Sequence, residues 1–127
     1  MIQIKNKSAI MKMKEAGMLL ASIFEQIPGI LTAGISAFDI DAWIEKSIRE
    51  KSLKSTMKGY RGYPNVSCIS VNDEVVHGIP MKTKLFSEGD LVKVDVCVSY
   101  KGYCADMART FIVGQDSITN NQKSKKL

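Results

Sequence analysis

Two apolar segments joined by a Lys-Gly pair constrain this chain more than any other feature. Residues 91–99 and 105–113 are rich in β-branched side chains, which favour strands. Lys101-Gly102 lies between them, and its glycine supplies the positive φ that a tight hairpin turn requires. The sequence therefore predicts an antiparallel hairpin whose register is set by a two-residue turn.

That register predicts two carboxylates on one face of the hairpin. Asp95 should lie diagonally across from Asp106, about 7–8 Å away at the backbone, whereas a three-residue loop would put them on opposite faces. Two such anions repel unless a cation or a donor lies near them. Carboxylate oxygens suit Mg²⁺, Mn²⁺, Fe²⁺ or Co²⁺, so the pair is a candidate metal site. The alternatives are that Asp106 begins an edge strand, or that Asp95 pairs with Lys93 or Arg109.

A first helix is expected near the start of the chain. Asn6 or Ser8 could cap it, and it should run to Gln26, before Pro28-Gly29. Its three- and four-residue spacing predicts one buried apolar stripe. The stripe consists of Ile10, Met13, Gly17, Leu20, Phe24 and Ile27.

A second helix should begin at a capping box formed by Ser36 and Asp39 and end near Lys51, with Trp43 in the core. After Ser55 the pattern changes to that of strands. The expected strands cover residues 66–71, 74–77, 91–99 and 105–113. Two helices followed by an antiparallel sheet predict an α+β fold class.

Composition limits the number of domains, the partners and the cellular location that we expect for the protein. The 127 residues are 45% hydrophobic, enough for one domain, and no run is long enough to span a membrane. The net charge of +5 is spread along the chain, which argues against a specific nucleic-acid partner. Cys97 and Cys104 should be too far apart to bridge, which fits reduced thiols and a cytoplasmic location. Residues 115–127 form a polar tail in which Ser117 or Thr119 could cap a further helix.

Five blocks in a fixed order closely resemble type I methionine aminopeptidases. They are Gly59-Tyr60-Arg61-Gly62-Tyr63-Pro64, Cys68-Ile69-Ser70-Val71-Asn72, Val76-His77-Gly78-Ile79-Pro80, Glu88-Gly89-Asp90, and the hairpin that carries Asp95 and Asp106. The resemblance implies the N-terminal half of a pita-bread (creatinase/aminopeptidase) fold. It assigns residues 1–114 to that half and residues 115–127 to a truncated start of the next helix.

The resemblance also implies a metal site. Asp95 and Asp106 match the family's two metal-binding aspartates, with Asp106 bridging two divalent ions (Co, Mn, Fe or Zn). The family's other ligands, a histidine and two glutamates, belong to the second half of its fold. They have no counterpart here, so activity of this chain alone does not follow from the resemblance.

Substrate-binding residues follow from the resemblance in the same way. His77 matches a catalytic histidine that contacts the scissile peptide, and Tyr60, Tyr63 and Cys68 match the methionine pocket. Met57 stands where many bacterial relatives have a cysteine. Without the family, His77 as a lone histidine would more often be structural, and the two tyrosines could be strand-edge aromatics.

The implied function is metal-dependent removal of the initiator methionine from nascent proteins by a methionyl aminopeptidase. The expected partners are N-terminal methionyl peptides, with the ribosome as a further candidate and no membrane. A non-catalytic pita-bread binding module, or an inactive fragment, is the alternative from a different class. A prolidase or aminopeptidase P relative is less favoured, because those proteins usually carry an additional N-terminal domain and lack the segment at residues 59–64.

Overall fold

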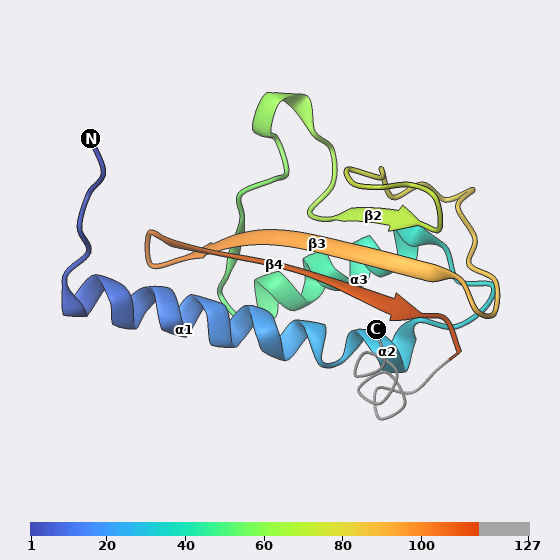
Figure 1. Cartoon of the computed structure of the whole chain (residues 1–127), viewed down its shortest axis with the longest axis horizontal. Coiled ribbons are helices and arrows are strands. Elements are labelled where there is room, and N and C mark those ends of the chain that lie inside the picture. Colours follow the sequence, from blue (N-terminus) through green and yellow to red (C-terminus); the bar gives the residue numbers. More distant parts are fainter. Residues whose placement is uncertain (115–127) are drawn as a thin grey trace.

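A layer of helices covers one face of an antiparallel sheet in this computed structural model, which describes residues 1–114 (Figure 1). The helices are α1 (Lys7–Phe24), α2 (Ile27–Ile30) and α3 (Ala37–Glu50), and a short 3₁₀ turn covers Tyr60–Gly62. The strands are β1 (Lys54–Ser55), β2 (Cys68–Val71), β3 (Leu91–Tyr100) and β4 (Tyr103–Ile112). The predicted order of helices before sheet is confirmed.

Strand β3 is the centre of the sheet. It pairs with β4 along one edge, while β1 and β2 pair with successive parts of its other edge. Its side chains alternate, so Val92, Val94, Val96 and Val98 are fully buried under the helices. The intervening residues 93, 95, 97 and 99 lie on the other face, which the helices leave open. The core therefore occupies only one side of the sheet.

The β3–β4 hairpin has the predicted register. Lys101 and Gly102 both have positive φ, at 49° and 83°, as a two-residue type I′ turn requires. Tyr100 then pairs with Tyr103, and Cys97 pairs with Asp106. The cysteines Cys68, Cys97 and Cys104 are all free, as expected.

Helix α1 begins directly after Asn6, one of the two residues predicted to cap it. The side chain of Asn6 accepts a hydrogen bond from the Ala9 N–H at 2.9 Å, so Asn6 rather than Ser8 is the cap. The stripe is buried at Leu20 and Phe24 but wrong at its start, where Ile10 is 55% exposed and Met13 40%. The buried face of α1 begins instead at Ala9 and Ala16, which are 6% and 0% exposed, so Ile10 and Met13 lie to one side of it. The start of α1 also extends beyond the tip of the β3–β4 hairpin (Figure 1).

The predicted end of the first helix differs from the structure, whereas the predicted start of the second agrees with it. Pro28-Gly29 does not simply end the first helix, because both residues lie inside the short α2. The capping box of α3 is confirmed: Ser36 Oγ accepts from the Asp39 N–H at 3.1 Å, and Asp39 Oδ2 accepts from the Ser36 N–H at 3.2 Å. Trp43 is partly buried against the core.

The strand predicted over residues 74–77 is wrong. These residues form a loop, in which Val75 and Val76 are 78% and 63% exposed, and His77 has a φ of 58°. A positive φ is incompatible with an extended ladder, so two β-branched residues were not enough to make a strand here. The strand predicted from Val66 likewise starts later, at Cys68.

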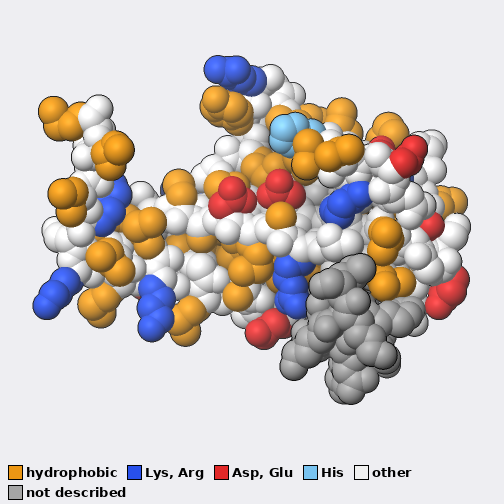
Figure 2. All heavy atoms as spheres, in the orientation of Figure 1, with side chains coloured by type: hydrophobic (Ala, Val, Ile, Leu, Met, Phe, Trp, Pro, Cys, Tyr) orange, Lys and Arg blue, Asp and Glu red, His pale blue; other side chains and the backbone are white. Residues whose placement is uncertain are grey.

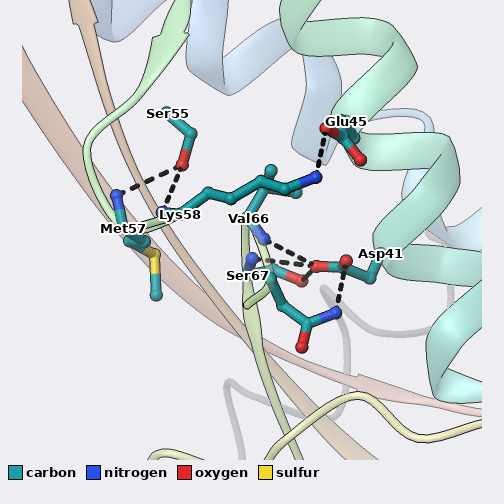
Figure 3. Close-up of polar contacts among 8 residues, drawn as sticks. Asp41, Glu45, Ser55, Met57, Lys58, Val66 and Ser67 are labelled. Carbon is teal, nitrogen blue, oxygen red and sulfur yellow. Dashed lines mark hydrogen bonds and ion pairs between the residues drawn. The ribbon is translucent and has the colours of Figure 1, made fainter. Parts of the chain in front are cut away.

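Strand β2 starts late because the preceding backbone is held by a helix. The carboxylate of Asp41, on α3, is 4% exposed and accepts hydrogen bonds from the N–H groups of Val66 and Ser67 at 3.2 and 2.9 Å (Figure 3). The Ser67 hydroxyl (2.6 Å) and the Asn65 amide (2.8 Å) also donate to it. Because one buried anion satisfies four donors, it fixes the entry into β2.

Within residues 1–114, no helix combines the length and the apolar character needed to cross a membrane. The tail predicted over 115–127, including the caps at Ser117 or Thr119, lies outside the described residues, so the domain boundary at 114 stays a prediction.

Replacing Asp41 with alanine should lower the free energy of unfolding by about 2–4 kcal/mol, because it leaves several buried donors without an acceptor. Urea unfolding with an unchanged m-value measures this. Glu45→Ala is the matched control on the same helix, since Glu45 pairs with Lys58 at 2.7 Å on the surface (Figure 3) and should cost at most about 1 kcal/mol. Equal losses for the two variants would contradict the role assigned to Asp41.

Candidate active site

The two aspartates lie on the open face of the sheet, as the register predicted. Asp95 pairs with Ala108, and Asp106 pairs with Cys97, so the two carboxylates are diagonal neighbours on one face. Figure 2 shows acidic side chains, the histidine and exposed hydrophobic side chains on the same side of the molecule. The hairpin therefore brings together two anions that lie eleven positions apart in the sequence.

The charge pairs considered for Asp95 are not formed. Lys93 Nζ donates instead to the backbone carbonyl of Asn72 at 2.7 Å. Arg109 lies on the helix-facing side of β4, with its guanidinium 5.7 Å from the centre of the Phe111 ring. Asp106 lies within β4, which is an edge strand, and does not begin it. Its side chain is exposed.

Burial and repulsion act on Asp95 together. Desolvation, followed by the negative charge of Asp106, raises the pKa of the Asp95 carboxyl above its ordinary value, and nearby His77 acts weakly in the opposite direction. The ionised form of Asp95 is therefore disfavoured in the protein alone. Such a pair would gain most from a cation placed between its members.

Two hollows meet at His77. One, of about 200 Å³, is lined by His77, Asp95, Lys93 and Ser70. The other, of about 440 Å³, is lined by Met57, Tyr60, Tyr63, Cys68, His77 and Ile79. The resemblance predicts that His77, Tyr60 and Tyr63 border the same cleft as the two aspartates. The structure instead has adjoining hollows that share His77, and Asp106 lines neither of them. A larger hollow on α1 shares no lining residue with these two.

The larger of the two adjoining hollows has no lysine, arginine or carboxylate among its lining residues, and two of those residues carry sulfur. Tyr63 donates its hydroxyl to the Ser67 carbonyl at 2.7 Å, and the Cys68 thiol donates to the Tyr63 oxygen at 3.4 Å. Burial raises the pKa of both Tyr63 and Cys68, so both remain neutral near pH 7. Met57 Sδ accepts a hydrogen bond from the Cys97 N–H at 3.4 Å. These walls suit an apolar, polarizable side chain.

The residues predicted to form the methionine pocket differ in their burial. Cys68 is buried and Tyr63 is partly buried, whereas Tyr60 is 64% exposed and forms the rim. Sequence reasoning missed Thr56 and Ile79 as lining residues of this hollow. Ile79 lies within one of the family-like blocks, but no periodicity marked either residue.

The aspartates fit only part of a metal site. Among residues 1–114, no group of three or more histidine, cysteine, aspartate or glutamate side chains is arranged to hold a metal ion. Asp95 and Asp106 can therefore supply two carboxylates, and further ligands would have to come from outside the described residues. The donor chemistry itself, hard oxygens on a partly open face, suits divalent cations.

Comparison of the sequence with known families gives one assignment over most of the chain. A model of metallopeptidase family M24 matches residues 11–126. The methionine aminopeptidase of Buchnera aphidicola (subsp. Schizaphis graminum) is 39% identical over 96% of this chain and 47% of that protein. The methionine aminopeptidase of Escherichia coli K12 is 40% identical over 92% of this chain and 45% of that protein. The chain thus spans about half the length of the curated relatives it matches.

Solved structures give the same picture of the fold. A methionine aminopeptidase from Thermotoga maritima superposes with a TM-score of 0.85 at 40% identity, covering 96% of this chain and 49% of that one. An X-Pro aminopeptidase from Thermotoga maritima superposes with a TM-score of 0.73 at 21% identity, over 94% of this chain and 32% of that one, and shows a likeness of fold alone. The predicted pita-bread architecture and the predicted resemblance are both confirmed.

Asp95→Asn should stabilise the metal-free chain at neutral pH. Because the pKa of Asp95 is raised in the folded state, its charged form costs folding free energy above the unfolded pKa of about 3.9, and this cost vanishes below it. The melting temperature of Asp95→Asn in EDTA should exceed that of the wild type at pH 7, and the difference should shrink toward pH 4.

Asp90→Asn is a control with the opposite sign. Hydrogen bonds from the Asn72 side chain and the Ser87 N–H lower the pKa of Asp90, so its charged form is favoured by folding. This variant should melt below the wild type at pH 7, and its deficit should shrink as the pH falls. A lower melting temperature for Asp95→Asn than for the wild type at pH 7 would contradict the repulsion described above.

His77 offers a second test, of backbone strain. At a φ of 58°, glycine avoids the Cβ clash that alanine meets, so His77→Gly should be more stable than His77→Ala by about 1 kcal/mol. At exposed Lys46 in the middle of α3 the order should invert, with glycine about 1 kcal/mol less stable than alanine. Chemical denaturation of the four variants measures both differences. The same order at both positions would show that His77 is not held in this conformation.

Proposed function

Because this chain belongs to metallopeptidase family M24, we propose that it carries part of the active site of a methionine aminopeptidase, which removes the initiator methionine from nascent proteins. One observation carries the proposal. Two carboxylates of the kind that bind metal share the open sheet face, and His77, in a neighbouring loop, lines both the hollow at Asp95 and a second, sulfur-lined hollow. The names of the relatives, at 39–40% identity, support the same activity.

In this proposal the larger hollow binds the methionine side chain. A thioether is apolar and polarizable, and the walls offer the Tyr63 ring, the Cys68 thiol and the Met57 thioether. The hollow of about 440 Å³ is amply large for a methionine side chain. Tyr60, at the rim, would cover the bound side chain and reduce its contact with water.

The aspartates would hold the metal. Asp95 and Asp106 would supply anionic oxygens to two divalent ions (Co, Mn, Fe or Zn), and further ligands would have to come from outside the described residues. When bound, such ions supply Lewis-acid polarisation of a peptide carbonyl and activation of water. The raised pKa of Asp95 supports this role, because the carboxylate pair is unfavourable without a cation.

His77 would act between the two hollows. It lines both of them, so its imidazole can contact the peptide bond that follows a methionine side chain held in the larger one. A ring N–H there can donate to the peptide oxygen and stabilise the charge that develops on it. His77 is thus the proposed catalytic residue of this chain.

The setting of the reaction is part of the proposal. The substrates would be N-terminal methionyl peptides, met in the cytoplasm as chains emerge from the ribosome. Three free thiols fit a reducing compartment. The expected absence of membrane and of specific nucleic-acid partners stays a prediction, as does the assignment of residues 1–114 to one unit.

A non-catalytic binding module is the second candidate. It is favoured by one observation, the lack of a third metal ligand among residues 1–114. A prolidase-like specificity has weaker support, because the likeness to the X-Pro aminopeptidase is one of fold at 21% identity.

The 127-residue chain alone should bind divalent metal weakly and should not turn over methionyl peptides. Two carboxylates leave most coordination positions to water, so calorimetric titration with Mn²⁺ should give a Kd no tighter than about 0.1 mM. Release of methionine from Met-Ala-Ser, with Co²⁺ or Mn²⁺, is measured beside an Ala-Pro peptide and an Asp106→Ala control. Metal-dependent turnover that Asp106→Ala abolishes would show that self-association supplies the other ligands or that they are dispensable.

Complementation then separates the two candidates. A separately expressed second half of a methionine aminopeptidase should restore release of methionine when added to this chain, and should fail with Asp106→Ala. If both halves fold but no activity returns, the binding-module reading leads. Cleavage of Ala-Pro in preference to Met-Ala-Ser would instead favour the prolidase-like specificity.

A further inference from the structure

The loop that carries His77 is held by little apolar burial. Val75 and Val76 are 78% and 63% exposed, and Ile79 is 49% exposed. His77 itself adopts a left-handed conformation, with a φ of 58°, which costs a histidine about 1 kcal/mol. A strained backbone of this kind persists only where surrounding contacts determine it. Polar contacts therefore hold this loop in place.

An inner contact fixes the residue that follows His77. The Gly78 N–H donates to Ser70 Oγ at 2.9 Å, and the Gly78 carbonyl accepts from the Ile69 N–H at 2.8 Å. A Cβ on residue 78 would lie 2.3 Å from the Ile69 carbonyl oxygen, so only glycine fits. Ser70 is 2% exposed, which places this contact out of water. The backbone next to His77 is thus docked on β2.

An outer contact closes the loop that contains His77. Lys84 Nζ donates to both carboxylate oxygens of Glu74, at 2.8 and 2.9 Å, and to the Ile69 carbonyl at 3.2 Å. Glu74 Oε2 also accepts the Val71 N–H at 2.7 Å. The contact therefore ties both ends of residues 75–83 to β2.

The Glu74–Lys84 pair differs from the other ion pairs formed among residues 1–114. The Lys84 side chain is 12% exposed. By contrast, Lys46 and Glu50 are 3.8 Å apart and 68% and 63% exposed, which is the geometry of a pair that contributes little. Lys84 also donates to backbone, so its loss leaves the Ile69 carbonyl without this donor and leaves the Glu74 carboxylate with only the Val71 N–H.

We infer that Glu74 and Lys84 are positioning residues, whose ion pair closes residues 75–83 onto β2 and so sets the place of His77 relative to Asp95. The link to Asp95 is direct, because Cys68 of β2 pairs with Asp95 of β3. One strand therefore carries both the docked loop and the neighbour of the carboxylate. The importance of this placement for catalysis rests on the proposed function, but the placement itself does not.

The test uses the single histidine of the chain as a reporter. In Lys84→Met, the ring proton resonances of His77 should move toward random-coil shifts, and hydrogen exchange at the Gly78 amide should accelerate at least about tenfold, as expected for a locally opened loop. Exchange at β3 amides paired with β4 should stay within about twofold. Lys84→Arg, which keeps the charge and the donors, should retain the resonances of the wild type.

Lys46→Met is the matched control, since it removes an exposed ion pair on α3 and should leave both readouts unchanged. Unchanged His77 resonances and Gly78 exchange in Lys84→Met would overturn the inference. Equal acceleration at Gly78 and at the β3 amides would also overturn it, because the pair would then stabilise the whole fold and not the loop. None of these readouts uses enzymatic activity, so failure of the proposed function would leave this result intact.

Discussion

The alternation of β3 is the constraint on which the rest of this structure depends. One set of its side chains, four valines, packs under α1 and α3, and the other set points away from the helices. Burial of the valines fixes which face is which, since a slip of one residue would exchange the two sets. The position of Asp95 on the open face is therefore a consequence of how the core is built.

The turn at Lys101-Gly102 extends that constraint to the second aspartate. With two residues at positive φ, the turn leaves one register for β4, and in that register Asp106 shares the face of Asp95. The pair is costly in the protein alone, as the raised pKa of Asp95 indicates. A core and a turn thus hold together two groups that repel each other, which is typical of a site built for a cation.

Polar anchors, and not apolar packing, complete the site. Asp41 fixes the segment that leads into β2, through donors at residues 65–67, and the Glu74–Lys84 pair fixes the loop that leaves it. Both anchors act on the same short strand. Because β2 lies beside Asp95, the tyrosine-lined hollow and His77 are brought to the aspartates by one four-residue element.

Local patterns were sufficient for the helices, the capping box, the hairpin and the shared face of Asp95 and Asp106, because each depends on periodicity or on turn chemistry within a few residues. They failed at residues 74–77, where β-branched side chains suggested a strand, and at Ile10 and Met13, because the buried face of α1 runs through Ala9 and Ala16 instead. The position of His77 between two hollows, the roles of Asp41 and Lys84, and the rim position of Tyr60 were decided only by the tertiary structure. Each of these features depends on contacts between residues ten or more positions apart, which irregular loops bring together. No local repeat in the sequence encodes the course of such a loop.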